Sequence, residues 1–328
     1  MPLLAKLPRV VERYWAMMLR LLTRTCALSA ALLVPIPPLG ASAASLSTPP
    51  NVDASFVAGS LQIDRYGKGN PIVLLPGMTA GTWEWYDTIR HLDVHHTVYA
   101  ISLPGFDGRP PANPPLFDRF TSDFWSFVNT QHVARPVVIG HSLGGTLAIL
   151  LGEQHPERLR GIIALDGMPL FPGMERVTAE QRADGAQQAA TTIAAESQTQ
   201  LRDYEKTYMN GPGGVLDSAL ADQLADLEAR GDPPTIAEWL REDLGGDLRP
   251  DLPKIRVPLL EIAPFNQADM ANSLHPFTAD QKVQYYETLL AGAPRVQVVS
   301  IAPARHFAML DQPQQFFAIV DAFIAQNR

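Results

Sequence analysis

The stretch Val138–Gly145 reads V-I-G-H-S-L-G-G and places one serine between two glycines, directly after an apolar run. The residues around it predict a buried strand over Pro136–Gly140 and a helix over Leu143–Gln154. Ser142 therefore falls where a strand turns sharply into a helix, in the pattern G-x-S-x-G. Such a turn is strained and lifts the serine hydroxyl above the sheet. A serine there is also a common helix cap, but the flanking elements favour a nucleophile.

Short apolar runs alternate with helical patterns along most of the chain. Continuous runs such as Pro71–Leu75 and Gly161–Leu165 are typical of strands buried inside a parallel sheet. Their alternation with helices predicts βαβ units. Between 168 and 250 the chain is instead rich in Ala, Gln, Glu and Asp at helical spacing. The sequence thus predicts an α/β fold, in which a mostly parallel central sheet with helices on both faces carries an inserted helical cap.

The first 43 residues have the layout of a secretory signal peptide. A basic lead is followed by the uncharged segment Cys26–Leu39, and Ala41–Ala43 fits an A-x-A cleavage site. The apolar run is shorter than the ~20 residues that a spanning helix needs, and it contains prolines, so an uncleaved anchor is the weaker alternative. We expect cleavage near Ala43, export to the periplasm or the medium, and no stable membrane insertion of the cleaved chain.

Composition narrows the range of functions. The 328 residues carry a formal net charge of −8, and the predicted leader removes more basic than acidic residues, so the exported chain is acidic. An acidic protein is a poor partner for nucleic acid or anionic membranes. The one cysteine, Cys26, lies in the leader, which excludes thiol catalysis and cysteine-bound zinc from the exported chain. No metal or other cofactor is implied.

A serine nucleophile needs a base, and His306 is the best placed of the eight histidines. It follows the last predicted strand, Arg295–Ile301, and precedes the final predicted helix. A histidine in this loop lies at the carboxyl edge of the sheet, where Ser142 also lies. His141, although next to the serine in sequence, is expected to pack or hydrogen-bond locally.

Four motifs together resemble the α/β-hydrolase family: L-L-P-G-M at 74–78, S-L-P-G-F-D-G at 102–108, G-H-S-L-G-G at 140–145 and R-H-F-A-M-L-D-Q-P at 305–313. The resemblance covers about residues 58–167 and 251–328. With the leader, the expected domains are 1–43 signal peptide, 44–167 first part of the hydrolase core, 168–250 helical cap insertion and 251–328 second part of the core. The resemblance implies a serine hydrolase that cleaves small-molecule carboxylic esters through an acyl-enzyme, as carboxylesterases do.

The sequence leaves open which residue is the acid of the implied Ser-Asp-His triad. The family usually places it after the strand that here ends at Ile262, and the first carboxylate of the following loop is Asp269. We prefer Asp269, although the loop lacks the family's glycine and the carboxylate comes about two residues late. Asp166, directly after an earlier strand, is the alternative, because some members take the acid from there. Glu261, a third candidate, is disfavoured by its place inside a strand. In such a triad the carboxylate orients the histidine and stabilises the imidazolium that forms when the histidine is protonated.

The backbone N–H groups of Met78 and Leu143 are the expected oxyanion hole. Leu143 directly follows the nucleophile, and Met78 lies in the loop after the first buried strand. The substrate pocket is expected between core and cap, near five aromatic residues: Trp83, Trp85, Phe106, Phe171 and Phe265.

Other functions would use the same residues. An aminopeptidase, amidase, lactonase or acyltransferase would share the triad. A peptidase would also need a cap carboxylate to hold a free amine, for which the candidates are Glu175, Glu180 and Glu196. A protein that keeps the triad but only binds a ligand is the remaining alternative.

Overall fold

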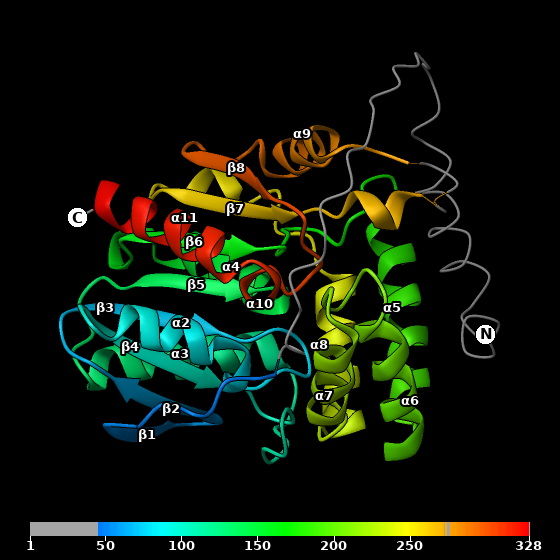
Figure 1. Cartoon of the computed structure of the whole chain (residues 1–328), viewed down its shortest axis with the longest axis horizontal. Coiled ribbons are helices and arrows are strands. Elements are labelled where there is room, and N and C mark those ends of the chain that lie inside the picture. Colours follow the sequence, from blue (N-terminus) through cyan, green and yellow to red (C-terminus); the bar gives the residue numbers. More distant parts are fainter. Residues whose placement is uncertain (1–44, 272, 274–275, 328) are drawn as a thin grey trace, which may run out of the picture.

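The computed structural model describes residues 45–271, 273 and 276–327. In this part of the chain, eight strands form one sheet in the order β1-β2-β4-β3-β5-β6-β7-β8 (Figure 1). Strand β2 is antiparallel to β1 and β4, and the other neighbours are parallel. The strands are β1 (Ala54–Ala58), β2 (Leu61–Tyr66), β3 (Asn70–Leu75), β4 (His96–Ser102), β5 (Val137–His141), β6 (Gly161–Leu165), β7 (Leu259–Pro264) and β8 (Val296–Ile301). The predicted leader lies outside the described residues.

Helices cover both faces of the sheet. Alternate residues of β3 enter two separate apolar cores, with Val73 and Leu75 in one and Ile72 and Leu74 in the other. Figure 1 shows α2 and α11 on the near face of the sheet. The first core receives side chains from α3 (Leu116–Thr130), α4 (Leu143–Gln154) and α9 (Ala279–Leu290), and the second from α2 (Tyr86–Leu92) and α11 (Pro313–Gln326). The predicted fold class, a mostly parallel sheet with helices on both faces, is confirmed. None of the helices in the described ranges is long and apolar enough to cross a membrane.

Four helices between β6 and β7 stand beside one end of the sheet (Figure 1). They are α5 (Ala179–Ala194), α6 (Gln198–Met209), α7 (Ser218–Glu228) and α8 (Pro233–Gly245). A polar side chain precedes each helix and accepts from a backbone N–H of its first turn: Thr178, Ser197, Asp217 and Asp232. These caps satisfy donors that have no partner within the helix. We refer to α5–α8 as the cap helices.

Helix α8 joins the cap helices to the core. Trp239 is fully buried, and its Nε1 donates to the backbone oxygen of Pro104 at 3.1 Å. Glu242 accepts from the backbone N–H groups of Leu116 and Phe117, the first residues of α3, at 2.6 and 2.8 Å. A carboxylate at a helix N-terminus satisfies free donors and complements the helix dipole. The attachment therefore combines a buried indole that donates one hydrogen bond with a carboxylate that caps the N-terminus of α3.

Candidate active site

Ser142 occupies the sharp turn between β5 and α4. Its backbone has φ 52° and ψ −120°, a conformation that residues other than glycine rarely adopt. A Cβ added at Gly140 would lie 2.0 Å from the Gly144 oxygen, and one added at Gly144 would lie 2.3 Å from the Leu75 oxygen. Both glycines are therefore required by close backbone contacts. The Ser142 N–H donates to Leu165 O at 2.8 Å, which ties the turn to the end of β6.

His306 lies between β8 and the short helix α10 (Ala308–Asp311), and its ring reaches the turn at Ser142. The rings of His306 and His141 have centroids 4.6 Å apart, which places the imidazole beside the residue that precedes the serine. His306 Nδ1 lies 2.6 Å from Asp166 Oδ2, and both side chains are mostly buried. Asp166 directly follows β6, the strand whose end also holds the Ser142 backbone. The structure thus gathers the predicted base and one of the predicted acids at Ser142.

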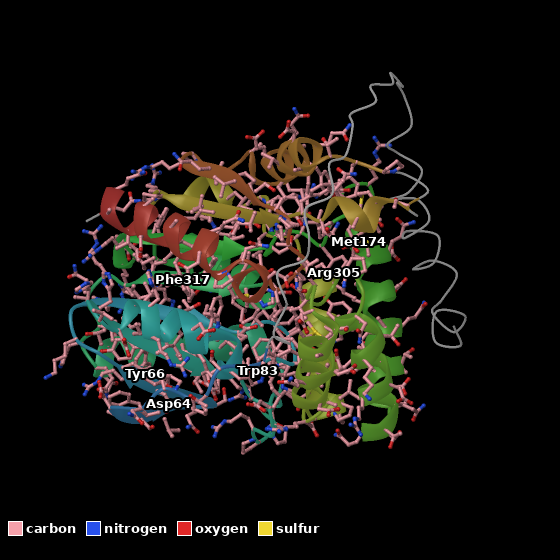
Figure 2. All side chains as sticks on the ribbon, viewed as in Figure 1. Asp64, Tyr66, Trp83, Met174, Arg305 and Phe317 are labelled. Carbon is pink, nitrogen blue, oxygen red and sulfur yellow. The ribbon has the colours of Figure 1, made fainter. Side chains whose placement is uncertain are left out.

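Asp269, the acid preferred from the sequence, pairs with Arg305 and not with His306. Arg305 donates to it twice, from Nη2 to Oδ1 at 2.7 Å and from Nε to Oδ2 at 3.0 Å. The same guanidinium donates to the backbone oxygens of Asn210 and Val215 in the cap region. Figure 2 shows Arg305 where the sheet meets the cap helices. The assignment of Asp269 as the partner of His306 is therefore corrected: Asp166 holds the imidazole, and Asp269 fixes a loop by a bidentate ion pair.

Asp166 is kept ionised by cationic and hydroxyl neighbours from α9. Burial favours the neutral acid, yet the Lys282 ammonium, 3.2 Å from Oδ1, helps to hold the pKa of Asp166 well below its usual range. Hydrogen bonds from His306 and from the Tyr286 hydroxyl act in the same direction. Lys282 and Tyr286 were not predicted. Their i,i+4 spacing on a helix that follows β7 was the available signal, because it puts both side chains on one helix face.

The surroundings of His306 favour the neutral form of its imidazole. Burial lowers the pKa of His306 below its ordinary value and outweighs the opposing effect of Asp166. The ring is therefore uncharged at neutral pH, as a general base requires. The Nδ1 proton is directed to Asp166, so Nε2 is the nitrogen left free to accept a proton.

Replacing Lys282 with methionine is expected to move the acidic limb of the kcat/KM profile to higher pH. The nearby ammonium disfavours the imidazolium, so its removal raises the pKa of His306. Because the base is inactive when protonated, activity is then lost at a higher pH. The measurement is a pH–rate profile with a p-nitrophenyl ester. Lys254→Met, which removes an exposed ammonium paired with Asp251, is the matched control. An unchanged limb, or one moved to lower pH, would contradict this account.

The predicted oxyanion donors flank the serine. Leu143 begins α4, so its N–H has no acceptor within the helix. Met78 lies in the loop after β3, between Gly77 and Thr79. This loop packs against the turn, because a Cβ at Gly77 would lie 2.8 Å from His141 Nδ1 and 3.6 Å from Ser142 Cβ. Both N–H groups are therefore carried by segments that adjoin Ser142.

A buried pair behind the serine, Glu84 and His141, was not predicted. Glu84 Oε2 lies 2.9 Å from His141 Nδ1, and both side chains are at most 1% exposed. The other oxygen, Oε1, accepts from Gly77 N–H at 3.1 Å. Burial raises the pKa of Glu84 well above its ordinary value and lowers the pKa of His141 to about 4. A neutral His141 and a carboxyl group whose protonated form is favoured by burial thus join the loop of Met78 to the turn of Ser142. In the sequence, Glu84 stands between two tryptophans in W-E-W, and this pattern was the available signal that its carboxyl group is buried and needs a partner.

Glu84→Gln is expected to fold with nearly native stability, whereas Glu84→Leu is expected to lose several kcal/mol. Glutamine can accept from Gly77 with its oxygen and donate to His141 with its amide. Leucine leaves both buried groups unpaired, at about 1–3 kcal/mol each. Urea unfolding at pH 7 measures the difference. Equal losses in the two variants would show that the hydrogen bonds of this pair do not hold the loop.

The aromatic residues predicted for the pocket separate into two groups. Trp83 borders the site, because it stacks on Phe307, the residue after His306, with centroids 6.3 Å apart. The others are packed in the interior or lie at the surface, with Trp85 0%, Phe106 1%, Phe265 6% and Phe171 36% exposed. In the described ranges, no group of three or more His, Cys, Asp and Glu residues is arranged to hold a metal ion.

Comparisons with known proteins identify the family. Residues 72–319 match the alpha/beta hydrolase family. A pimeloyl-[acyl-carrier protein] methyl ester esterase from Aeromonas hydrophila is 25% identical over 281 residues, which cover 81% of this chain and 99% of that protein. MenH from S. aureus has a similar solved structure, with a TM-score of 0.66, 18% identity, and 81% and 98% of the two chains covered. An esterase from Thermogutta terrifontis also shares the fold, with a TM-score of 0.64, 17% identity, and 81% and 93% covered. Because the family match spans most of its length, this chain belongs to the α/β hydrolase family.

Proposed function

We propose that this protein is a serine hydrolase that cleaves carboxylic esters through an acyl-enzyme, with a triad of Ser142, Asp166 and His306. The observation that carries the proposal is the 2.6 Å contact of His306 Nδ1 with Asp166 Oδ2, beside the strained turn at Ser142. The reaction named for the Aeromonas hydrophila relative supports an ester as the substrate. Small alkyl esters of carboxylic acids are therefore the first substrate class to test.

The proposed reaction has two halves. In the first, Ser142 Oγ bonds to the carbonyl carbon while His306 Nε2 takes the hydroxyl proton, and the oxyanion accepts from the N–H groups of Met78 and Leu143. The bond to the alcohol oxygen then breaks, and His306 gives its proton to the departing alcohol. In the second half, water attacks the acyl-enzyme, its proton passes through His306 to Ser142 Oγ, and the carboxylic acid leaves.

Asp166 supports both halves of this reaction without exchanging a proton. Its carboxylate fixes the tautomer with the proton on His306 Nδ1 and stabilises the imidazolium that forms at each proton transfer. The depressed pKa of Asp166 suits this role, because the carboxylate stays charged throughout.

A substrate panel tests the proposal. Purified enzyme is assayed with p-nitrophenyl esters of increasing acyl length beside aminoacyl p-nitroanilides. We expect turnover of esters over anilides, and labelling of Ser142 by a fluorophosphonate located by mass spectrometry. Preference for the anilides would support an aminopeptidase instead. Turnover of neither class would favour the alternative in which the protein only binds a ligand.

We also propose that the chain is exported after cleavage near Ala43. The basic lead, the uncharged apolar segment and the A-x-A pattern support this. N-terminal sequencing of protein from the periplasm or medium is expected to begin at Ala44. A full-length product retained in the membrane would overturn the proposal.

A further inference from the structure

The peptide unit that carries the Met78 N–H is restrained by two hydrogen bonds at Gly77. The Gly77 oxygen, which lies in the same peptide plane as the Met78 N–H, accepts from the Ala80 N–H at 3.3 Å. The Gly77 N–H, one peptide earlier, donates to Glu84 Oε1 at 3.1 Å. A glycine leaves the rotations about its Cα unusually free. These two bonds therefore restrict the direction in which the Met78 N–H can point.

Thr79, the residue after Met78, shows that this loop is strained. Its φ is 64°, in the left-handed region that a β-branched residue rarely adopts. Its hydroxyl donates to the Met78 oxygen, which is a bond within the loop. Strained residues persist only where surrounding contacts over-determine the backbone. The loop therefore needs partners beyond its own residues, and Glu84 is one of them.

Glu84 connects this loop to the turn of Ser142. It lies in the short helix η1 (Thr82–Trp85) and is 1% exposed. One of its oxygens accepts from Gly77, and the other, Oε2, lies 2.9 Å from His141 Nδ1. A single carboxyl group thus contacts the residue before Met78 and the residue before Ser142. It spans the two segments that carry the predicted oxyanion donors.

Aromatic side chains hold the ring of His141 in place. The ring centroid of Phe307 lies 4.5 Å from that of His141, and the centroid of Trp85 lies 6.5 Å from it. A Cβ at Gly77 would lie 2.8 Å from His141 Nδ1, so there is no room for a side chain between the loop and the ring. The carboxyl group of Glu84 therefore has a fixed anchor in His141, from which it holds Gly77.

Neutral groups can make both of these bonds. Burial raises the pKa of Glu84 well above its ordinary value and lowers the pKa of His141 to about 4, so the uncharged form of each is favoured. A protonated carboxyl group can donate to His141 while its other oxygen accepts from Gly77. A glutamine side chain has the same length and offers the same combination of one acceptor and one donor group.

We infer that Glu84 is a positioning residue of the oxyanion hole, which aims the Met78 N–H at the developing oxyanion. It acts through its bonds to Gly77 and His141. The inference rests on the proposed ester hydrolysis and adds to it a residue that touches no reacting atom. Oxyanion donors contribute most when they are aimed in advance at the place where charge develops. The bonds of Glu84 are therefore expected to favour the transition state over the bound substrate.

Two matched ketones test this role. With a trifluoromethyl alkyl ketone, Ser142 Oγ bonds to the carbonyl carbon, the hydroxyl proton passes to His306, and the π-electron pair moves to the oxygen. The product is an oxyanion that resembles the transition state. The methyl ketone of the same chain length represents the bound substrate. We expect the advantage of the trifluoromethyl ketone, as the ratio of the two inhibition constants, to fall about 10²-fold in Glu84→Leu. Correspondingly, kcat is expected to fall by a similar factor while KM changes little.

Two further variants of Glu84 distinguish its bonds from its bulk. Glu84→Gln can make both bonds and is expected to recover most of the advantage that Glu84→Leu loses. Glu84→Asp keeps the carboxyl group but withdraws it by one methylene, so it cannot reach Gly77 and His141 together. It is expected to lose about tenfold of the advantage. Because aspartate is smaller and polar, this variant also provides the measurement if Glu84→Leu does not fold.

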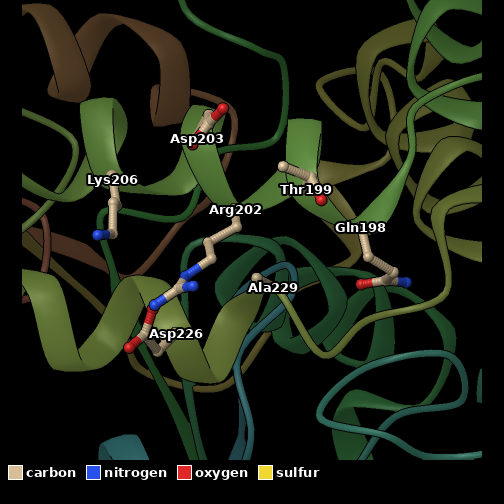
Figure 3. A pocket seen from close by; sticks show the side chains of 7 residues that line it. All are labelled: Gln198, Thr199, Arg202, Asp203, Lys206, Asp226 and Ala229. Atoms are coloured by element: carbon tan, nitrogen blue, oxygen red, sulfur yellow. The ribbon is translucent and has the colours of Figure 1, made fainter.

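Asp226→Asn is the control for these variants. Asp226 pairs with Arg202 at 2.6 Å in an open groove on the outer faces of α6 and α7 (Figure 3). Its replacement removes a carboxylate far from Gly77 in the sequence and is expected to keep the wild-type ratio, kcat and KM. Circular dichroism and titration of Ser142 with a fluorophosphonate correct each preparation for unfolded or inactive protein.

The outcomes separate this inference from the proposed function. Equal affinity of the wild-type enzyme for the two ketones would show that no oxyanion forms at Ser142, which removes the esterase and with it this role of Glu84. A wild-type enzyme that prefers the trifluoromethyl ketone, beside Glu84→Leu and Glu84→Asp variants that prefer it equally, would leave the esterase standing and overturn the inference. A parallel loss of affinity for both ketones would assign Glu84 a purely structural role and would overturn it as well.

Discussion

Replacing Ser142 with alanine is expected to lower kcat for p-nitrophenyl esters by about 10⁶-fold, to the residual rate that the oxyanion hole and binding alone supply. The hydroxyl is the group that forms the acyl-enzyme, and alanine offers no substitute. Alanine keeps the Cβ that the backbone at φ 52° already accommodates, so the turn is expected to remain folded. Steady-state kinetics and circular dichroism of the same preparation measure both effects.

Ser55→Ala is the control for this variant. Ser55 lies on β1 at the edge of the sheet, where its hydroxyl donates to Asp64 in an exposed pair. It is expected to retain wild-type kcat and KM. Retention of substantial ester hydrolysis in Ser142→Ala, in the absence of contaminating enzyme, would show that another group is the nucleophile.

Asp166→Asn is expected to reduce kcat by about 10³- to 10⁴-fold. The amide can donate to His306 Nδ1 and so stabilise the wrong tautomer, with the proton on Nε2, where a base must accept one. The variant also removes the negative charge that stabilises the imidazolium. Lys282, 3.2 Å from Asp166 Oδ1, then faces a neutral group, which further disfavours protonation of His306. The measurement is kcat over a range of pH, because a lowered pKa of His306 alone would move the acidic limb to lower pH and leave the plateau unchanged, whereas the wrong tautomer lowers the plateau itself.

Asp269→Asn is the matched comparison, because it removes the other candidate acid. It weakens the bidentate contact with Arg305, so a loss of thermal stability is expected. Most of kcat is expected to remain, since His306 keeps its bond to Asp166. A severe loss of kcat in Asp269→Asn beside an active Asp166→Asn would contradict the assignment made from the structure.

The sequence was sufficient for the fold and for the strained turn that carries Ser142. The glycines around Ser142 are imposed by backbone contacts within a few residues, so a pentapeptide reveals them. The apolar runs reveal the strands for the same reason. The edge strand β1 was not predicted, because its apolar residues do not alternate with polar ones: Val57 lies on the exposed face, and the other face is at most half-buried.

The partners of His306 depend on contacts between distant segments, and here the sequence was less informative. Asp166 and Asp269 both follow strands that end near the histidine, and their order in the chain does not distinguish them. Arg305, the residue before His306, distinguishes the two acids, because its guanidinium forms an ion pair with Asp269. The buried contact between Glu84 and His141 joins segments that are 57 positions apart. No local pattern encodes such pairings.

The attachment of α8 to the core sets a limit on how substrate specificity can be exchanged within this scaffold. Trp239 and Glu242 fasten this one helix to the Pro104 loop and to the start of α3. A chimaera that replaces the whole insertion would leave two backbone N–H groups of α3 without their acceptor and would remove a fully buried indole. Because α5 packs along α8, grafting should therefore exchange the segment that contains α6 and α7 and retain both α5 and α8.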